Sequence, residues 1–290
     1  MDLTARPVGS KRSFVLLAPA GACLAAFHGD VKVDGSAFQD LLSKMQRLRG
    51  RVYLNDGAIQ QSDLTRDGRH VSGMDKESWH LLTVNEDGRV MGCARILSHS
   101  CSTPFEGLTV SHSALAKCPE WGNQLRKSIE GERQRACQAN FLWLEMGGWA
   151  LSEELRGTTE ALLYALATYA WSQLMGGAIG ISTVTERNGS SSILRRLGGQ
   201  SLENGRGTLP AYYDGNYRCQ MEVLRFDSRI PNQKYRSTIE SLRVQMAQVS
   251  VVSAASAATW DSCVSNYLPA SASRYWLNAA RVSAQEAHPH

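Results

Sequence analysis

The chain has 290 residues, of which 43% are hydrophobic and 20% are charged, and this ordinary globular composition allows one large domain or two modest ones with a sizeable core. Its 31 Lys and Arg residues against 27 Asp and Glu residues give a formal net charge of +4 without any run of five or six like charges, so the balance does not indicate binding to nucleic acid. A mildly basic surface would still attract an acidic or phosphate-bearing partner.

The N-terminal region, residues 1–35, is predicted to be an extension of the folded domain. Two basic residues precede an apolar stretch at residues 14–27, and this arrangement has the outline of a signal peptide. Pro19 and Gly21 interrupt the stretch, and about fourteen apolar residues are too few to cross a bilayer as a helix. We therefore expect an extension that packs on the domain or stays loose, with export as the alternative.

The first regular element is a predicted helix at residues 36–48. These residues place apolar side chains on one helical face, namely those of Phe38, Leu41, Leu42, Met45 and Leu48. The spacing predicts an amphipathic helix that begins after a Gly-Ser start signal. Residues 49–74 lose this period and contain Asn-Asp-Gly, Asp-Gly and Ser-Gly turn signals. A polar connection of this length is usually functional or disordered, and we expect a mobile flap.

Strand signals begin with a hairpin. Two β-prone runs, residues 78–84 and 89–97, flank an Asn-Glu-Asp-Gly turn sequence, which predicts two antiparallel strands. The following elements are then expected in chain order: a strand at 139–151, a helix at 158–174, a strand at 178–185, a short helix at 190–197 and a strand near 218–226. This order is typical of an α+β sheet with crossover helices.

The C-terminal region contains one further helix signal. Residues 235–249 are amphipathic, and the sequence after them is rich in Ser and Ala, which predicts a weakly ordered tail. We therefore divide the chain into the extension at residues 1–35, a central domain at residues 36–230, and a C-terminal helix and tail at residues 231–290.

The cysteines and histidines show no metal or nucleophile motif. The cysteines are scattered without a CxxC pair, at Cys23, Cys93, Cys101, Cys118, Cys137, Cys219 and Cys263. Reduced thiols in a cytoplasmic protein are expected from this pattern. The histidines nearest the strands, at positions 70, 80 and 99, have no spacing suited to a metal or a catalytic dyad. Cys93 and Ser98 lie in no motif such as G-x-S-x-G, so a covalent enzyme intermediate has little support.

Three segments carry a resemblance to a known family. Residues 75–97, 143–151 and 182–199 resemble, in order and spacing, the acyl-homoserine-lactone autoinducer synthases and the N-acyl amino acid synthases. Both groups belong to the GNAT superfamily of acyltransferases. The resemblance covers about residues 36–228. It implies an α+β, GNAT-like fold with a mixed, mostly antiparallel sheet flanked by helices and with splayed central strands.

The resemblance implies substrate-binding residues before the first strand. In those families a helix ends in an Arg that lies four residues before an aromatic residue, and Arg49 and Tyr53 match this spacing. The family also has an acidic residue ahead of the first strand. Glu77 stands at the family's distance from Leu81, and Asp75 lies two residues earlier, so both are candidates.

On the strands themselves, Arg95 matches the Arg that closes the second strand, and Glu145 matches the acid of the third. Autoinducer synthases carry an Arg-Phe pair just after that acid, where this chain has Gly148 and Trp149. In the family that Arg helps to hold the amino-acid-like substrate. Its absence argues against S-adenosylmethionine as acceptor and against a lactone product, while Trp149 remains a candidate for substrate binding.

Glu145 is the predicted general base. Acyl transfer to nitrogen needs a neutral amine, whereas a free amine is mostly protonated near neutral pH. A carboxylate that reaches the amine directly or through one water can take the proton if burial has raised its pKa. Trp143 lies on the same strand face as Glu145 and would contribute an apolar environment. The alternatives for Glu145 are a salt bridge with Arg95 and a substrate-orienting role.

Strand residues are also predicted to hold the acyl donor. Splayed strands can direct a backbone N–H at the thioester oxygen, and Met146, Gly147 and Gly148 permit this, because consecutive glycines allow a bulge or a close backbone approach. Thr183 and Thr185 share one face of a later strand, where their hydroxyls would line the acyl or pantetheine channel. Ordinary strand termination and ordinary packing are the respective alternatives.

A loop before the predicted helix at 158–174 is the candidate phosphate site. GNAT enzymes hold the pyrophosphate of the donor where a loop enters a helix, because unpaired N–H groups at a helix start bind anions. The loop is matched in part, with one glycine, by Arg156, Gly157, Thr158 and Thr159. The alternative is an ordinary Thr-capped helix.

The sequence therefore predicts an enzyme. We expect an N-acyltransferase that moves a medium or long acyl chain from an acyl carrier protein or CoA thioester to an amino acid or similar small amine. The thioester would be a co-substrate, and no permanently bound cofactor, metal, nucleic acid or stable membrane span is expected. Two alternatives remain: an acyl-homoserine-lactone synthase that uses S-adenosylmethionine, and a non-catalytic sensor of acyl ligands with the same fold.

Overall fold

The computed structural model describes residues 12–205 and 207–254. Its main sheet contains β1 (Arg12–Ala18), β2 (Val31–Val33), β3 (Trp79–Asn85), β4 (Val90–His99), β5 (Leu142–Leu151), β6 (Ala178–Thr185), β7 (Gln200–Ser201), β10 (Tyr212–Asp214), β11 (Cys219–Asp227) and β12 (Ser250–Ser253). A separate ribbon pairs β8 (Glu203–Asn204) with β9 (Gly207–Thr208). The helices are α1 (Gly35–Asn55), α2 (Ala114–Lys117), α3 (Gly122–Gln138), α4 (Glu160–Leu174), α5 (Ser190–Leu197) and α6 (Arg236–Ala247). Short 3-10 turns include η2 (Gly73–Lys76), η4 (Thr109–His112), η5 (Glu153–Leu155) and η6 (Arg187–Gly189).

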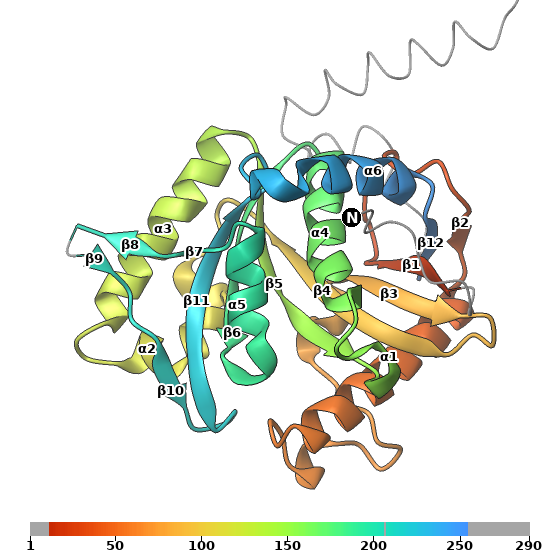
Figure 1. Cartoon of the computed structure of the whole chain (residues 1–290), viewed down its shortest axis with the longest axis horizontal. Helices are drawn as coiled ribbons and strands as arrows, with labels where there is room; N and C mark the ends of the chain where they lie inside the picture. Colours follow the sequence, from red (N-terminus) through yellow and green to blue (C-terminus); the bar gives the residue numbers. More distant parts are fainter. Residues whose placement is uncertain (1–11, 206, 255–290) are drawn as a thin grey trace, which may run out of the picture.

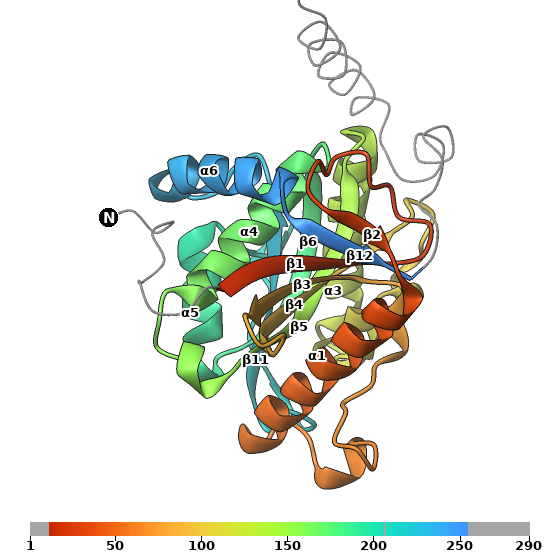
Figure 2. The ribbon, with the colours of Figure 1, turned by 90° about the vertical axis from the view of Figure 1, so that its right-hand side faces the viewer.

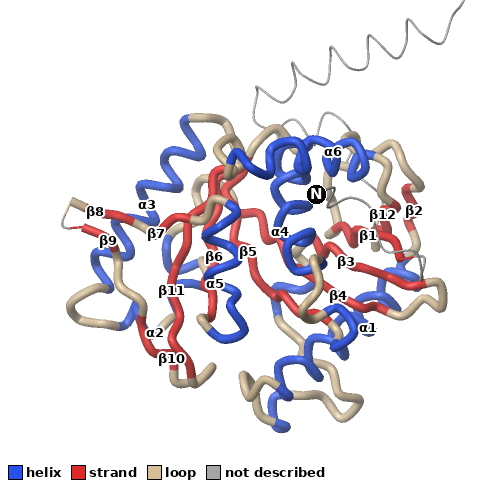
Figure 3. Tube along the Cα trace, in the orientation of Figure 1, coloured by secondary structure: helices blue, strands red, loops and turns tan. Residues whose placement is uncertain are grey.

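The sheet is mixed and mostly antiparallel, as expected. Its ten strands follow the order β10-β11-β6-β5-β4-β3-β1-β12-β2, with β7 paired to β11. Parallel neighbours are β5 with β6, β1 with β12, and β12 with β2. Figure 3 shows these strands as one layer with helices on both sides. The predicted hairpin is β3 and β4, which pair antiparallel.

Helices cover both faces of the sheet. On one face, α4 packs between the strands and α6, which explains why its sequence is apolar almost all round. The opposite face is divided between α1, which packs mainly on β4 and β5, and α3, which packs on β5 and β6. Figure 1 shows the order of the strands, and Figure 2 shows α1 and α4 on opposite sides of them. Burial of these apolar faces is the main stabilising term of such a fold.

The sheet extends beyond the predicted central domain. Within the region predicted as an extension, β1 pairs antiparallel with β3 and parallel with β12, and Leu16, Leu17 and Ala18 are fully buried. The boundaries at residues 35 and 230 therefore do not bound the sheet. A short apolar run suits a buried strand and a signal peptide equally well, so composition could not distinguish them. The predicted Ser/Ala-rich tail lies outside the described residues.

Helix α1 continues beyond the residue at which its prediction ended. It runs to Asn55, because Leu48 and Val52 continue its buried face. Gly50 allows the following loop to approach closely, since a Cβ there would lie 2.7 Å from the Gly68 carbonyl oxygen. The segment predicted as a flap then folds back on the helix, where the His70 N–H donates to the Gln46 carbonyl at 3.1 Å. None of the helices in the described part of the chain has the length and hydropathy that a bilayer span requires.

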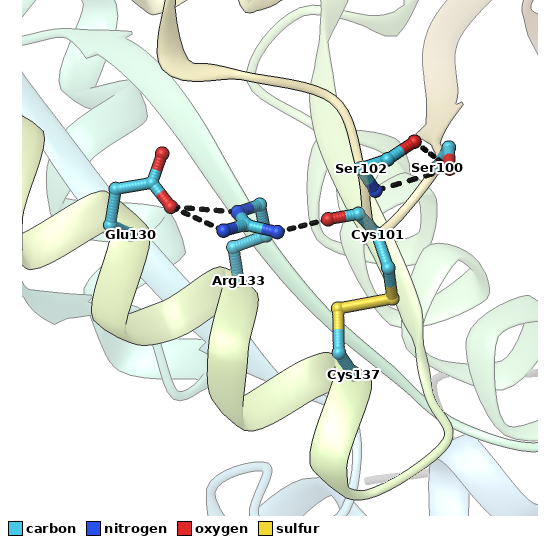
Figure 4. Close-up of a disulfide and its surroundings, with 6 residues drawn as sticks. All are labelled: Ser100, Cys101, Ser102, Glu130, Arg133 and Cys137. Atoms are coloured by element: carbon cyan, nitrogen blue, oxygen red, sulfur yellow. Dashed lines mark hydrogen bonds and ion pairs between the residues drawn. A yellow bond between two sulfur atoms is a disulfide. The ribbon is translucent and has the colours of Figure 1, made fainter.

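A disulfide joins Cys101, just after β4, to Cys137 near the end of α3 (Figure 4). One turn earlier in α3, Arg133 donates to the Cys101 carbonyl and pairs with Glu130 at 2.7 Å. The expectation of reduced thiols is therefore wrong for these two cysteines. Their sequence separation is 36, and only the fold brings α3 back beside β4. The bond fastens the start of the loop that connects β4 to α2.

Candidate active site

The central strands separate at the predicted position. Parallel pairing of β5 with β6 stops after Glu145 and Ile181, and Figure 1 shows the two strands diverging from there. Just beyond this point, the Ser182 hydroxyl donates to the Met146 carbonyl at 2.9 Å. Because no strand fills the opening, side chains from several elements surround it. The expected splay of the central strands is confirmed.

A bulge interrupts the other edge of β5. Arg95 of β4 is opposite Gly147, and Cys93 is opposite Ala150, so β5 carries an extra residue between them. Gly148 has a φ of +63°, and a Cβ there would lie 3.0 Å from the Arg95 Cβ. A side chain at this position would meet both backbone strain and a close contact. The bulge gives a physical reason for glycine at this position.

A cleft of about 770 Å³ lies at the opening between β5 and β6. Most of the predicted site residues line it, namely Tyr53, Arg95, Glu145, Met146, Gly147, Trp149, Arg156, Gly157, Thr158, Thr183 and Thr185. Arg49, Asp75, Glu77 and Thr159 are not part of the lining. The predicted strand acid and the predicted donor loop therefore face one common space.

A smaller cavity of about 80 Å³ lies between the sheet and α4. Its wall is mostly apolar and includes Leu144, Tyr164, Ala165, Tyr169, Leu194 and Phe226. Arg95, Met146, Gly147 and Trp149 line both this cavity and the cleft. The apolar space therefore begins where the cleft passes between the strands, and its chemistry suits a hydrocarbon chain.

The Glu145 carboxylate is buried and fully hydrogen-bonded. One oxygen accepts from the Thr109 hydroxyl at 2.8 Å and from the Val110 N–H at 3.0 Å. The other lies 2.9 Å from His99 Nε2 and accepts from the Thr109 N–H at 2.8 Å. The alternative of a salt bridge with Arg95 is not observed, because the loop before α2 brings its own donors to the strand.

These hydrogen bonds reverse the expected titration of Glu145. Burial alone raises the pKa of its carboxyl, but hydrogen bonds from His99, Thr109 and Val110 outweigh burial and hold the pKa below its usual range. Glu145 is therefore ionised at neutral pH. A carboxylate with a lowered pKa and occupied oxygens is a weak base for an amine.

Glu145 fixes the turn η4 against the sheet. The N–H groups that it binds, those of Thr109 and Val110, open this turn, where backbone donors have no partner within the turn itself. This turn and the residue after it supply Thr109, His112 and Ser113 to the wall of the cleft. The sequence analysis missed this segment, because residues 100–113 contain no motif and form only short turns.

Arg49 and Asp75 form a buried ion pair behind the cleft. Their side chains are 2% and 1% exposed, with a closest distance of 2.7 Å. The Asp75 carboxylate also accepts from Gln46 at 2.9 Å and from the Ser72 N–H at 3.0 Å. Burial raises the pKa of Asp75, but the bonds from Arg49 dominate and lower it to about 2. Between the two predicted acids, Asp75 is thus the partner of Arg49, while Glu77 is exposed.

Unpaired N–H donors remain in the wall of the cleft. Arg95 donates to the Ser72 hydroxyl at 3.3 Å, but its Nε and the Trp149 Nε1 are buried without a hydrogen-bond partner in the described part of the chain. Burial raises the pKa of the neighbouring Tyr53 phenol, which stays protonated. Buried donors of this kind are costly unless a ligand or water satisfies them.

The predicted donor loop is held by an ion pair. Arg156 donates through both terminal nitrogens to the two carboxylate oxygens of Asp56, each at 3.0 Å. Gly157 adopts a φ of +72°. The Thr158 hydroxyl accepts from the Glu160 N–H at 3.2 Å, so it caps α4, whereas Thr159 makes no side-chain capping bond. The sequence analysis missed Asp56, because it lies in the segment expected to be a flap.

The strand β6 brings further polar groups to the cleft. Thr183 and Thr185 line the cleft, and the Thr185 hydroxyl donates to the Arg187 carbonyl at 3.4 Å. Arg187 also lines the cleft and donates to the Tyr217 carbonyl at 2.9 Å. Within residues 12–205 and 207–254, no three His, Cys, Asp or Glu side chains are placed to hold a metal ion.

No protein-family model matches the chain, and no curated protein matches it. Among solved structures, the fold is similar to that of BjaI, a CoA-dependent acyl-homoserine lactone synthase whose structure contains SAM and isopentyl-CoA. The two chains are 16% identical, and the match covers 87% of this chain and 97% of BjaI with a TM-score of 0.51.

Two further structures match with lower scores. The AHL synthase LasI is 19% identical, with 78% of this chain and 94% of LasI covered and a TM-score of 0.47. FeeM, an N-acyl amino acid synthase from uncultured soil microbes, is 11% identical, with 76% of this chain and 93% of FeeM covered and a TM-score of 0.45. At these identities the likeness is one of fold. The match to BjaI confirms the α+β, GNAT-like fold that the sequence resemblance implied.

Proposed function

We propose that this chain, which shares the fold of BjaI, is an N-acyltransferase that moves an acyl group from a thioester to the amino group of an amino acid or similar small amine. The observation that carries the proposal is the common cleft. Arg95, Glu145 and the loop of Arg156 line one opening where β5 and β6 separate. A donor lying between the strands and an acceptor lying against β4 would meet beside Met146.

The donor is a CoA or acyl carrier protein thioester. BjaI is CoA-dependent and its structure contains isopentyl-CoA, which supports the CoA form. The guanidinium of Arg156 suits a phosphate of the donor, because a planar fork of donors matches phosphate oxygens. The apolar cavity between the sheet and α4 suits its acyl chain, which we expect to be of medium or long length. Such thioesters are cytoplasmic, and we therefore assign the chain to the cytoplasm.

The acceptor carries a carboxylate. The unpaired Nε of Arg95 and Nε1 of Trp149 provide donors at the cleft wall, and a carboxylate would satisfy them. Tyr53 adds a protonated phenol to the same wall. The Arg49–Asp75 pair lies behind this wall, where we assign it a supporting role for α1 and η2 rather than contact with the acceptor.

The reaction is a direct transfer. The amine nitrogen attacks the carbonyl carbon of the thioester, the C–S bond breaks, and the thiolate leaves and takes up a proton. The amine must lose one proton to a base. The splayed strand segment at Met146 and Gly147 would direct backbone N–H groups at the developing oxyanion.

We assign the base to His112 and a positioning role to Glu145. Both oxygens of Glu145 are occupied by η4 and His99, whereas His112 ends η4, is exposed, and lines the cleft. Imidazole is the side chain that most often takes a proton in such reactions. By fixing Thr109 and Val110, Glu145 would hold His112 in place.

The test is a product assay. Pure protein is incubated with acyl-CoA and acyl carrier protein thioesters and a panel of amino acids and amines, and the products are identified by mass spectrometry. An N-acyl amino acid supports the proposal. Release of methylthioadenosine from S-adenosylmethionine would instead indicate a lactone synthase, a candidate favoured by the SAM and MTA found in BjaI structures. Thioester binding without turnover of any acceptor would indicate a sensor.

A further inference from the structure

Asp56 connects three elements at the mouth of the cleft. Its carboxylate accepts both terminal N–H groups of Arg156, at 3.0 Å each, and its carbonyl accepts from Arg187. The Arg187 guanidinium also reaches the carbonyl of Tyr217 at 2.9 Å. Asp56, Arg156 and Arg187 all line the cleft. The end of α1 is thereby tied to the loop before α4 and to the turn after β6.

The position of Asp56 is unfavourable for the helix that it ends. It is the C-cap residue of α1, and a negative charge at a helix C-terminus opposes the partial negative charge of the helix macrodipole. Helix stability therefore gives no reason for an acid here. Its side chain is only 20% exposed and faces a basic partner across a gap of 100 residues in sequence. The acid serves the cleft rather than the helix.

The Asp56–Arg156 contact has the geometry of a phosphate contact. Two parallel N–H donors of a guanidinium bind the two oxygens of a carboxylate or two oxygens of a phosphate in the same way. Arg156 belongs to the loop that we assign to the phosphate of the donor. Asp56 therefore occupies the place that a donor phosphate would take on this guanidinium.

We propose that Asp56 is a specificity-determining latch, which a phosphate-bearing thioester must displace from Arg156 to bind. This inference rests on the proposed function and adds how the donor is selected. The negatively charged diphosphate of CoA competes with the carboxylate for Arg156, and a thioester without phosphate cannot. Displacement of the side chain breaks the ion pair between the end of α1 and the loop before α4, whereas the contact of Arg187 with the Asp56 carbonyl does not depend on that side chain.

The experiment compares the binding of CoA with that of pantetheine, which lacks phosphate, by isothermal titration calorimetry. Wild type, Asp56→Asn, Arg156→Ala and the double variant are measured beside Asp40→Asn. Asp40 lies on the surface of the same helix and pairs with Lys44, so this control makes the same change of charge away from the cleft. Asp56→Ser gives a second test, and thermal unfolding verifies that each variant is folded.

Asp56→Asn should tighten CoA binding about two- to fivefold, as expected for loss of a partly exposed competing ion pair. Asp56→Asn should bind pantetheine as tightly as wild type does. Asp40→Asn should bind CoA as tightly as wild type does. Arg156→Ala should weaken CoA binding, and Asp56→Asn should give no gain in that background. Equal or weaker CoA binding by folded Asp56→Asn and Asp56→Ser overturns the latch.

Turnover of an acyl-N-acetylcysteamine thioester separates this inference from the proposed function, because that donor has no phosphate. Turnover by wild type with no effect of Asp56→Asn on CoA binding refutes the latch alone. Absence of acyl transfer from every thioester refutes the function, while the comparison of CoA with pantetheine still decides whether Asp56 competes with a phosphate.

Discussion

Replacement of Glu145 by Gln tests whether this residue positions the site or performs the chemistry. The wild-type carboxylate accepts hydrogen bonds from His99, Thr109 and Val110. A Gln side chain offers only one oxygen as an acceptor. Its NH₂ group would face backbone N–H groups, which cannot accept a hydrogen bond. At least one backbone N–H therefore loses its partner, together with the charge of the acceptor.

The expected loss of stability is about 3 kcal/mol, because a buried hydrogen bond to a charged group contributes roughly 1.5–3 kcal/mol and one donor remains unsatisfied. Urea unfolding measures this loss. If Glu145 acts by holding η4, kcat should fall together with stability, and the pH dependence of kcat should keep its shape. His112→Asn should behave in the opposite way, with little loss of stability and a kcat lower by about 10²-fold or more.

The positioning role of Glu145 is refuted if Glu145→Gln unfolds like wild type, while its kcat falls by two orders of magnitude and the acid limb of its pH profile disappears. That result would restore Glu145 as the general base. Thr109→Val is a useful companion, because it removes one donor to Glu145 and leaves the carboxylate in place. It should lower stability by about 1 kcal/mol and leave the pH profile unchanged.

Three further changes test the structure. Asp75→Asn leaves the Arg49 guanidinium, which is 2% exposed, without its carboxylate partner, and should lower the free energy of unfolding by about 3–5 kcal/mol in urea unfolding. In wild type, the pKa of Asp75 in the folded state is about 2, below the ordinary 3.8. The stabilisation that comes from the ionised Asp75 is therefore complete above about pH 4 and is lost as the pH falls through about 2. Cys101→Ser opens a loop with a sequence separation of 36 and should lower the unfolding free energy by about 4 kcal/mol, and a Tm insensitive to reductant in wild type would contradict the disulfide. Gly148→Ala should destabilise by about 1–2 kcal/mol because of its positive φ, whereas Gly131→Ala, in an open position of α3, should stabilise by about 0.5–1 kcal/mol.

Periodicity was sufficient to predict the central elements. The hairpin of β3 and β4, the strands β5 and β6, and the helices α4 and α5 lie where the apolar pattern and turn residues indicated. Helix α3 was not predicted, because charged residues dominate it and only Leu125, Ile129 and Ala136 supply buried apolar contacts. Strand β1 was not predicted, because a continuous apolar run has no period that identifies a strand.

The site was predictable where it depends on the strands and hidden where it depends on turns. Arg95, Glu145 and the Arg156 loop were indicated by the resemblance of the strand segments to a known family. The hydrogen-bond partners that decide the chemistry of these residues could not be predicted from the sequence. Thr109 lies 36 residues from Glu145 and Asp56 lies 100 residues from Arg156, and neither pair stands in a motif. The direction of the pKa shift of Glu145 was therefore wrong in the sequence analysis, because burial was counted and the donors were unknown.

The pairing of β1 with β12 has a consequence for synthesis of the protein. β1 is made long before its partner along Val15–Ala18, which is residues 250–253, near the other end of the described chain. Until those residues leave the ribosome, one edge of β1 has no neighbour, and an open strand edge invites pairing with other chains. A chain that stops at residue 230 would keep this edge permanently. The nascent protein therefore depends on β12 to protect this edge from aggregation.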